Sequence, residues 1–177
     1  MKIEKLLLKK KKNLFNPTIF RFATAFGLSD RMRYDLTINQ FVLEMYLKRQ
    51  IEIYDHKTWR PYCHLKDFAR LIYKSYKIDS KFINRQVFNA GSNKNNFNKI
   101  QIAQAIRKYI DGKIIIVKES KDKRNYKVNF NKLENKLNFK CLYGLDYGIK
   151  TILQNLKKQK KNKLNKNFLL GNFKIKS

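Results

Sequence analysis

Short runs of β-branched and aromatic residues alternate along this chain with longer segments whose apolar residues recur at helical spacing. This alternation favours an α/β or α+β layer architecture over a helical bundle, because each sheet face and helix stripe must bury its apolar side against another element. The segments predicted as strands are 18–26, 50–54, 62–65, 86–89 and 114–117, and the segments predicted as helices are 3–8, 37–48, 68–76 and 98–110. We expect segments 18–26 and 114–117 to be buried strands, and we expect Asp67 to cap the helix over 68–76.

The chain has 177 residues, of which 43% are apolar, so it is long enough to form one domain with a hydrophobic core. It has neither a continuous apolar stretch of roughly eighteen residues nor the pattern of a secretion signal, which predicts a cytoplasmic protein without a membrane contact. Cys63 and Cys141 have no other Cys or His nearby at metal-ligand spacing. They are therefore predicted to be reduced, buried thiols and not part of a disulfide or zinc framework.

A net charge of +28 is the most extreme property of the composition. Such a charge suggests a polyanionic partner such as RNA, DNA or a nucleotide. A second interpretation stays open, because Lys, Asn, Ile, Phe and Tyr are all abundant and are the residues that A/T-rich codons encode. The aromatic residues that could stack on bases, Tyr73, Tyr76 and Tyr109, lie at helical spacing and are predicted to face a core.

The chain shows no set of residues that would make it an enzyme by itself. His56 and His64 have no carboxylate or cysteine pattern that would complete a catalytic triad or a metal site. There is no glycine-rich loop of the G-x-G-x-x-G or G-x-x-x-x-G-K-[ST] type to hold a pyrophosphate. The pattern Tyr-x-x-x-Lys is expected by chance in so lysine-rich a chain, and it occurs at Tyr62/Lys66, Tyr73/Lys77 and Tyr109/Lys113. We therefore assign no catalytic residue and no metal ligand.

Several separated segments carry a resemblance to a known family. Arg21 to Gly27 reads R-F-A-T-A-F-G, Arg60 to Ala69 reads R-P-Y-C-H-L-K-D-F-A, and Val87 to Ser92 reads V-F-N-A-G-S. Asp122 to Tyr126 then contains a D-x-R element, and a closing helix follows over 137–149. In this order the segments resemble the extended short-chain dehydrogenases, specifically the NAD-dependent nucleotide-sugar epimerases and dehydratases.

The resemblance implies an α/β fold and a division of the chain. Residues 1–156 would be the C-terminal part of such an enzyme, containing the last Rossmann strands and a small α/β substrate-binding domain, and residues 157–177 would be a basic tail. Glu4 matches the glutamate that follows the family's catalytic lysine by four residues. The catalytic Tyr-x-x-x-Lys and the NAD-binding loop would then precede Met1, in an N-terminal Rossmann half absent from this chain.

The resemblance also implies the residues that would bind ligands. Arg60 and Arg124 would hold the diphosphate of a nucleoside-diphosphate sugar, because guanidinium groups match phosphate oxygens in a bidentate way. Asn39 would be a polar substrate contact, Thr24 would lie near cofactor and sugar, and Ala23 would lie on the side of the NAD cofactor. We expect Arg60 and Arg124 to converge on one hollow beneath residues 21–27.

Three functions are compatible with the sequence. In the first, the chain is part of a truncated or split epimerase/dehydratase that needs a separate N-terminal Rossmann polypeptide and is inactive alone. In the second, it is a non-functional remnant that aggregates through apolar surface on segments 18–26 and 114–117. The third is a basic nucleic-acid-binding module. The sequence leaves the sugar, the parent reaction and homodimer formation open.

Overall fold

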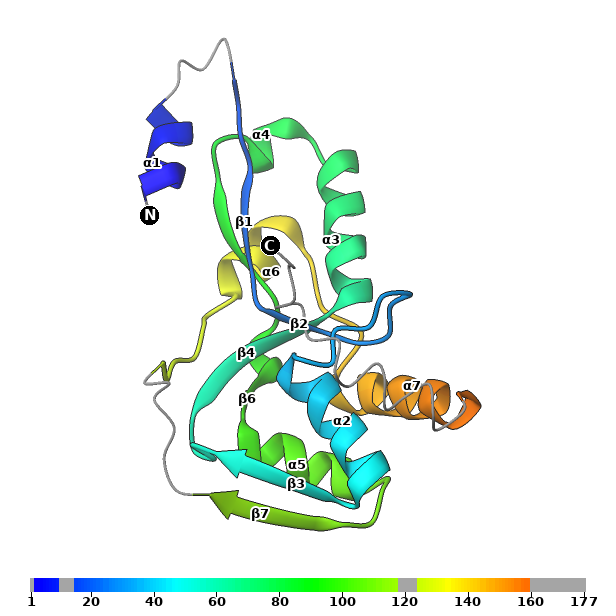
Figure 1. Ribbon diagram of the computed structural model, residues 1–177. Coiled ribbons are helices and arrows are strands. Elements are labelled where there is room, and N and C mark those ends of the chain that lie inside the picture. The colour runs from blue at the N-terminus through cyan, green and yellow to red at the C-terminus, as the bar shows by residue number, and fades with distance from the viewer. Residues whose placement is uncertain (1, 10–14, 118–123, 160–177) are drawn as a thin grey trace, which may run out of the picture.

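Two lobes joined by a narrow junction form the molecule, as the computed structural model shows (Figure 1). The structure describes residues 2–9, 15–117 and 124–159. The upper lobe in Figure 1 contains α1 (Lys2–Lys9), β1 (Ile19–Phe22), α3 (Leu65–Lys77), α4 (Ser80–Ile83), β5 (Val87–Ala90) and α6 (Asn131–Leu137). The lower lobe contains β2 (Thr24–Phe26), α2 (Thr37–Lys48), β3 (Gln50–Tyr54), β4 (Trp59–His64), the short helix η1 (Asn93–Asn95), β6 (Asn96–Asn98), α5 (Lys99–Arg107), β7 (Lys113–Val117) and α7 (Leu145–Lys158). This mixture of helices with small parallel sheets confirms the predicted α/β class.

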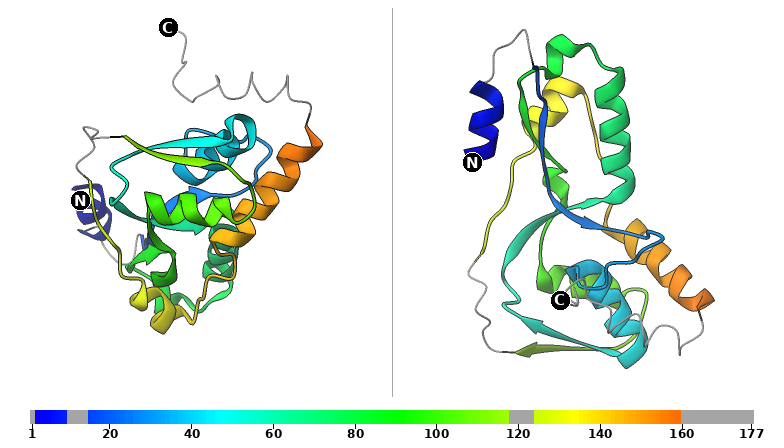
Figure 2. Two further views of the ribbon diagram at one scale, coloured as in Figure 1. Left: turned by 90° about the horizontal axis from the view of Figure 1, so that it is seen from below. Right: turned by 45° about the horizontal axis from the view of Figure 1, so that its top comes forward.

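The strands of the described residues pair into three small sheets. In the upper lobe β1 pairs with β5 in parallel, whereas β2 pairs in parallel with β4, which in turn pairs with β6 in antiparallel orientation. The prediction of one buried strand over 18–26 was wrong, because the chain changes partner at Ala23. The Ala23 amide still donates to the carbonyl of Ala90, 3.0 Å away, before β2 turns to β4. This change of partner carries the chain from one lobe to the other (Figure 2).

A large hydrophobic core fills the lower lobe. The apolar residues that predicted the helix over 37–48 are buried there, and α2 has the predicted bounds. At the start of α5, Asn98 and Gln101 form a capping box in which each side chain accepts from the other residue's amide, at 2.9 and 3.0 Å. Helix α7 approaches β2 so closely that a Cβ at Gly148 would lie 2.4 Å from the Phe26 ring. Residues of α2, α5 and α7 share this core.

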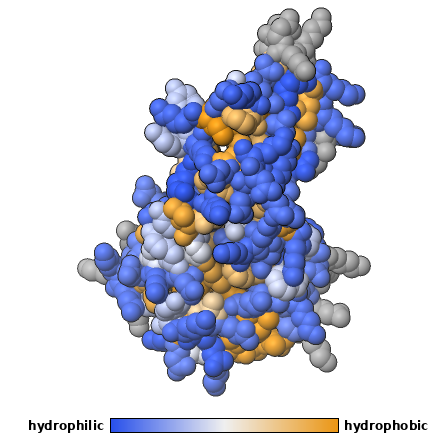
Figure 3. Space-filling view, turned by 180° about the vertical axis from the view of Figure 1, so that it is seen from behind, coloured by the Kyte–Doolittle hydropathy of each residue, from blue (hydrophilic) through white to orange (hydrophobic). Residues whose placement is uncertain are grey.

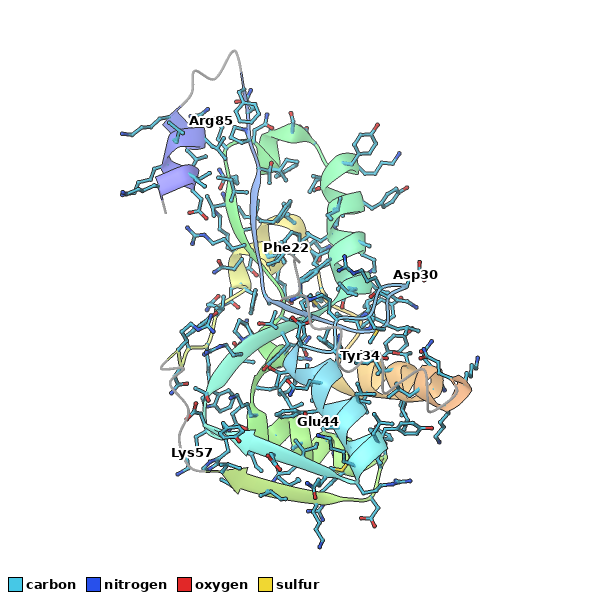
Figure 4. All side chains as sticks on the ribbon, viewed as in Figure 1. Phe22, Asp30, Tyr34, Glu44, Lys57 and Arg85 are labelled. Atoms are coloured by element: carbon cyan, nitrogen blue, oxygen red, sulfur yellow. The ribbon has the colours of Figure 1, made fainter. Side chains whose placement is uncertain are left out.

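The upper lobe has a smaller core. The residues that share it are Leu71, Phe88, Ala90, Leu133, Leu137 and Phe139. On its outside, α1 is attached by the Glu4–Arg21 salt bridge of 2.6 Å and by Arg85, labelled at the top of Figure 4, which donates to the carbonyl of Leu8. Apolar patches reach the surface of this lobe in the view from behind (Figure 3).

The start of α3 differs from the predicted cap. His64, and not Asp67, is the N-cap residue, and its Nδ1 accepts from the Lys66 amide at 3.1 Å. Asp67 is fully buried, and its two carboxylate oxygens accept from the amides of Leu142 and Tyr143, each at 3.0 Å. Asp67 therefore holds the segment between α6 and α7 against α3, which is a tertiary role that no local pattern could signal.

Two predictions of burial were also wrong. Among the described residues β7 pairs only with β3, and its Ile115 and Ile116 are 38% and 53% exposed. On α3, Tyr73 and Tyr76 are 67% and 82% exposed, because the helix turns Leu71 toward the core instead. Among the described residues, no helix has the length and hydropathy needed to cross a membrane.

Candidate functional site

Arg60 and the backbone of Arg124 lie together on one strip of the surface. Arg60 is on β4, opposite Phe97 of β6, and its guanidinium donates to the carbonyls of Arg124 and of Trp59. The guanidinium carbon is also 5.1 Å from the centroid of the Tyr126 ring. The arginine at 60 is thus held beside residues 124–126, although sixty-four residues separate it from Arg124. Whether both guanidiniums serve one ligand stays a prediction, and Asp122 and Lys123 of the D-x-R element lie outside the described residues.

Residues 124–127 are fixed to β4 by several further contacts. The Trp59 amide donates to Asn125 Oδ1 at 2.9 Å, and the Tyr126 amide donates to the Trp59 carbonyl at 3.2 Å. The Lys127 ammonium lies 3.6 Å from the centroid of the Trp59 ring. The site therefore combines cations with two aromatic rings, an arrangement that suits an anionic ligand with a planar base. We call this group, Trp59, Arg60, Arg124, Tyr126 and Lys127, the β4 strip.

Asn39 lies near the start of α2. It is 2% exposed, its Oδ1 accepts from the Gly27 amide at 3.1 Å, and its Nδ2 donates to the Arg33 carbonyl at 3.0 Å. Its amide group thus fixes the loop between β2 and α2. Gly27 has φ of 116°, and a Cβ there would lie 2.4 Å from His64 Nε2, so the loop needs glycine at that turn. The substrate role of Asn39 stays a prediction.

Thr24 and Ala23 lie at the junction of the lobes. Thr24 is half-buried and pairs in register with Tyr62, whose pKa is raised by burial. Ala23 lies beside Gly91, where an added Cβ would come within 3.3 Å of the Ala23 Cβ. Ala23 and Gly91 directly follow the carboxyl ends of β1 and β5, where ligands bind in open parallel sheets, and Thr24 is the first residue of β2. Their roles toward sugar and cofactor also stay predictions.

His64, at the end of β4, forms an aromatic group with Tyr143 and Tyr147. The His64 ring lies 5.4 Å from the Tyr143 ring and 5.3 Å from the Tyr147 ring, and Lys66 donates to the Tyr147 hydroxyl at 2.7 Å. Burial lowers the pKa of His64 to about 4, against the smaller opposing effect of Asp67. The imidazole is therefore neutral at pH 7, which is consistent with its capping of α3 through Nδ1.

The two cysteines are neighbours in space. The Sγ atoms of Cys63 and Cys141 are 3.8 Å apart, across a sequence separation of 78 residues, and both are free thiols, as predicted. Their proximity in space is a feature that the sequence spacing did not predict. With Asp67 they form a group whose possible ligand atoms lie within 4.8 Å of one another. Asp67 already accepts from two amides and from Arg70, which leaves only two sulfurs for a metal, fewer than the four ligands of a structural zinc site.

Comparison with known proteins identifies the fold. No protein-family model matches the chain. Among solved structures, ADP-L-glycero-D-manno-heptose-6-epimerase of Helicobacter pylori matches with a TM-score of 0.71 at 15% identity, over 89% of this chain and 49% of that one. The NAD-dependent NDP-hexosamine 5,6-dehydratase TunA, of tunicamycin biosynthesis, matches with a TM-score of 0.73 at 11% identity, over 93% and 52%.

UDP-glucose 4-epimerase of Thermotoga maritima, solved with UDP-glucose, matches with a TM-score of 0.68 at 19% identity, over 81% of this chain and 47% of that one. The chain has the fold of the NAD-dependent epimerase/dehydratase enzymes. It spans about half the length of the solved structures that it matches. The predicted resemblance to the extended short-chain dehydrogenases is confirmed at the level of the fold.

An NAD cofactor would find only part of a binding site among the described residues. The upper lobe offers a two-stranded parallel sheet with Ala23 and Gly91 at its carboxyl ends. A dinucleotide fold also needs a glycine-rich turn leading from a strand into a helix, and none of the described strands is followed by that sequence. The residues present therefore do not fit NAD by themselves.

Proposed function

We propose that this chain binds a nucleoside-diphosphate sugar and forms the substrate-binding part of an NAD-dependent epimerase/dehydratase. The observation that carries the proposal is the position of Arg60, whose guanidinium is held against residues 124–126 on the β4 strip. The shared fold supports it, since one matching structure was solved with UDP-glucose.

The chemistry of the β4 strip suits this ligand. A diphosphate carries about two negative charges, and a guanidinium provides five N–H donors in a planar fork. Arg60 and Arg124 would donate to the phosphate oxygens, and Lys127 would add a long-range attraction. The exposed Tyr126 ring would stack on the nucleoside base. Thr24 would face the sugar and Ala23 the cofactor, whereas Asn39 would act on the substrate through the loop that its buried amide group holds.

We further propose that a separate Rossmann polypeptide completes the enzyme. Among the described residues β1 pairs only with β5, so its second edge offers unpaired backbone groups on which another parallel strand could add. Such a partner would supply the NAD-binding loop and the Tyr-x-x-x-Lys that transfers a proton during hydride transfer to NAD. This chain alone would bind substrate without turning it over, in the cytoplasm.

Calorimetric titration of the chain with UDP-glucose and with dTDP-glucose tests the binding role. We expect Arg60→Ala and Arg124→Ala each to weaken binding by about ten- to a hundredfold, because each removes charge-assisted hydrogen bonds to phosphate. Arg107→Ala is the matched control, since this exposed arginine of α5 lies outside the strip and its loss changes the net charge equally. If all three variants lose affinity equally, the loss comes from the lower net charge and not from a specific site, which would refute the proposal.

A second candidate function is favoured by the outer face of α3. Tyr73 and Tyr76 are 67% and 82% exposed, and Lys77 lies 5.8 and 5.6 Å from their ring centroids. Exposed aromatics beside lysines on a chain of net charge +28 suit stacking on single-stranded RNA. Affinity for an oligonucleotide should then fall steeply with salt and fall further in Tyr73→Ala/Tyr76→Ala, whereas Arg60→Ala should leave it unchanged.

A further inference from the structure

The buried dithiol at the junction of the lobes is independent of the proposed binding site. Cys63 is 1% exposed on β4, where it pairs in register with Ala25, and Cys141 is partly exposed on the segment that runs from α6 to α7. We propose that Cys63 and Cys141 form a reversible oxidation site that a peroxide closes to an intramolecular disulfide.

Their surroundings hold the two thiols next to each other. Asp67 accepts from the amides of Leu142 and Tyr143, the two residues after Cys141, and thereby fixes the Cys141 backbone against α3. Arg70 donates to Asp67 at 2.6 Å and to the Lys140 carbonyl at 3.2 Å, which fixes the residue before Cys141 as well. The Sγ atoms are 3.8 Å apart, so a bond of about 2.05 Å needs them to approach by less than 2 Å. Side-chain rotation supplies much of such a movement.

The different exposure of the two thiols sets the order of the steps. Cys141 is the more exposed residue, whereas the hydrogen bond with the Cys141 thiol and burial raise the pKa of Cys63. The Cys141 thiolate would attack one oxygen of hydrogen peroxide, which breaks the O–O bond and gives a sulfenic acid and a hydroxide ion. The hydroxide becomes the first water by taking up the proton that the Cys141 thiol released when it ionised. The Cys63 thiol then attacks the sulfenic sulfur, the S–S bond forms, and the hydroxyl leaves with the thiol proton as a second water. Two thiols are oxidised and one peroxide is reduced.

The disulfide would join the two lobes covalently. Cys63 is one residue before the end of β4, and Cys141 is within the segment that links α6 in the upper lobe to α7 in the lower lobe (Figure 1). The bond would join two residues that are 78 positions apart in the sequence, and the loop that it closes would lower the entropy of the unfolded chain. We expect the oxidised protein to melt about 5–10 °C above the reduced protein.

Intact-mass spectrometry of the full 177-residue chain tests the proposal. After treatment with hydrogen peroxide, denaturation and maleimide labelling, the wild-type protein should carry no label and should have lost two hydrogen atoms. It should stay monomeric, dithiothreitol should restore both thiols, and a proteolytic peptide linking Cys63 to Cys141 should be found. This measurement requires no variant, so it stands even if a substitution prevents folding.

Two alanine variants add the kinetic control. Cys141→Ala should lose its remaining thiol at least tenfold more slowly than the wild type loses its pair, because Cys63 is shielded from peroxide. Cys63→Ala should accumulate a sulfenic acid at Cys141 that dimedone traps. Equal rates of thiol loss in the wild type and Cys141→Ala, disulfide-linked dimers as the main product, or stoichiometric zinc in the purified reduced protein would each overturn the proposal.

Discussion

The two lobes differ in how completely they bury their apolar residues. The lower lobe encloses a core shared by α2, α5 and α7, whereas the upper lobe buries only a small cluster around Leu71 and Phe88. The upper lobe also exposes Phe22 by 44% and Ile72 by 56%, and no other described strand pairs with its two-stranded sheet. The difference indicates that the lower lobe folds as a self-contained unit. The exposed apolar residues of the upper lobe are typical of a surface that contacts another protein.

The largest expected effect tests the self-contained core. Ile106→Ala removes a fully buried side chain of α5 and should lower the free energy of unfolding by about 2–5 kcal/mol, because it leaves a cavity in a closed core. Chemical denaturation of the whole chain measures it. Ile116→Ala on the exposed edge strand is the control and should change the free energy by less than about 0.5 kcal/mol. Similar losses in both variants would contradict the described packing.

The second prediction concerns the anchor between the lobes. Asp67→Ala leaves the amides of Leu142 and Tyr143 without their acceptor and should lower the free energy of unfolding by about 2–4 kcal/mol. In this variant, amide hydrogen exchange should become faster at residues 142 and 143, whereas the exchange rates in α5 should change less. An unchanged exchange rate at those two amides would show that Asp67 does not hold the segment.

The third prediction uses pH. The pKa of His64 is about 4 in the folded protein and about 6.5 in the unfolded chain, so unfolding takes up a proton between these values. The stabilisation is present above pH 6.5 and is lost as pH falls toward 4, a loss of on the order of 1–3 kcal/mol. His64→Asn keeps a capping side chain without a titratable group, so its stability should depend less on pH in this window. Parallel pH curves for the two proteins would contradict a buried neutral imidazole.

The smallest expected effect is on the exposed face of α3. Ile72→Ser should change the free energy of unfolding by less than about 0.5 kcal/mol, because this side chain is 56% exposed. The same change should reduce binding of a dye that reports apolar surface and should raise solubility. A loss of more than about 1 kcal/mol would mean that the upper lobe is better packed than its small cluster implies.

The sequence predicted elements well where a local pattern decides them. Helix α2 and strand β3 have the predicted bounds, because spaced apolar residues and strict alternation are local signals. Segment 18–26 is two strands and not the one predicted, since its break at Ala23 depends on two partner strands far along the chain. For the same reason the exposure of Ile116 and Tyr76 could not be predicted, because it depends on which face finds a neighbour.

The candidate site shows the same limit. Arg60 could be selected from the sequence by its resemblance to a family motif, but its contact with residue 124 crosses 64 residues. The Trp59–Lys127 contact and the Cys63–Cys141 pair had no local signal, because each joins segments that only the tertiary fold brings together. The family resemblance predicts that Asn39 contacts the substrate. Its side-chain amide group bonds to Gly27 and Arg33 and fixes the loop before α2, a structural role that the local sequence does not indicate.

Nuclear magnetic resonance titration of the isotope-labelled chain with UDP-glucose tests the central claim most directly. If the β4 strip binds the diphosphate, the amide signals of residues 59–60 and 124–127 should shift together with one saturating affinity. Signals of the outer face of α3 should stay in place. Shifts confined to α3, or no saturating shift at the β4 strip, would contradict the assignment of this chain as a nucleotide-sugar-binding part.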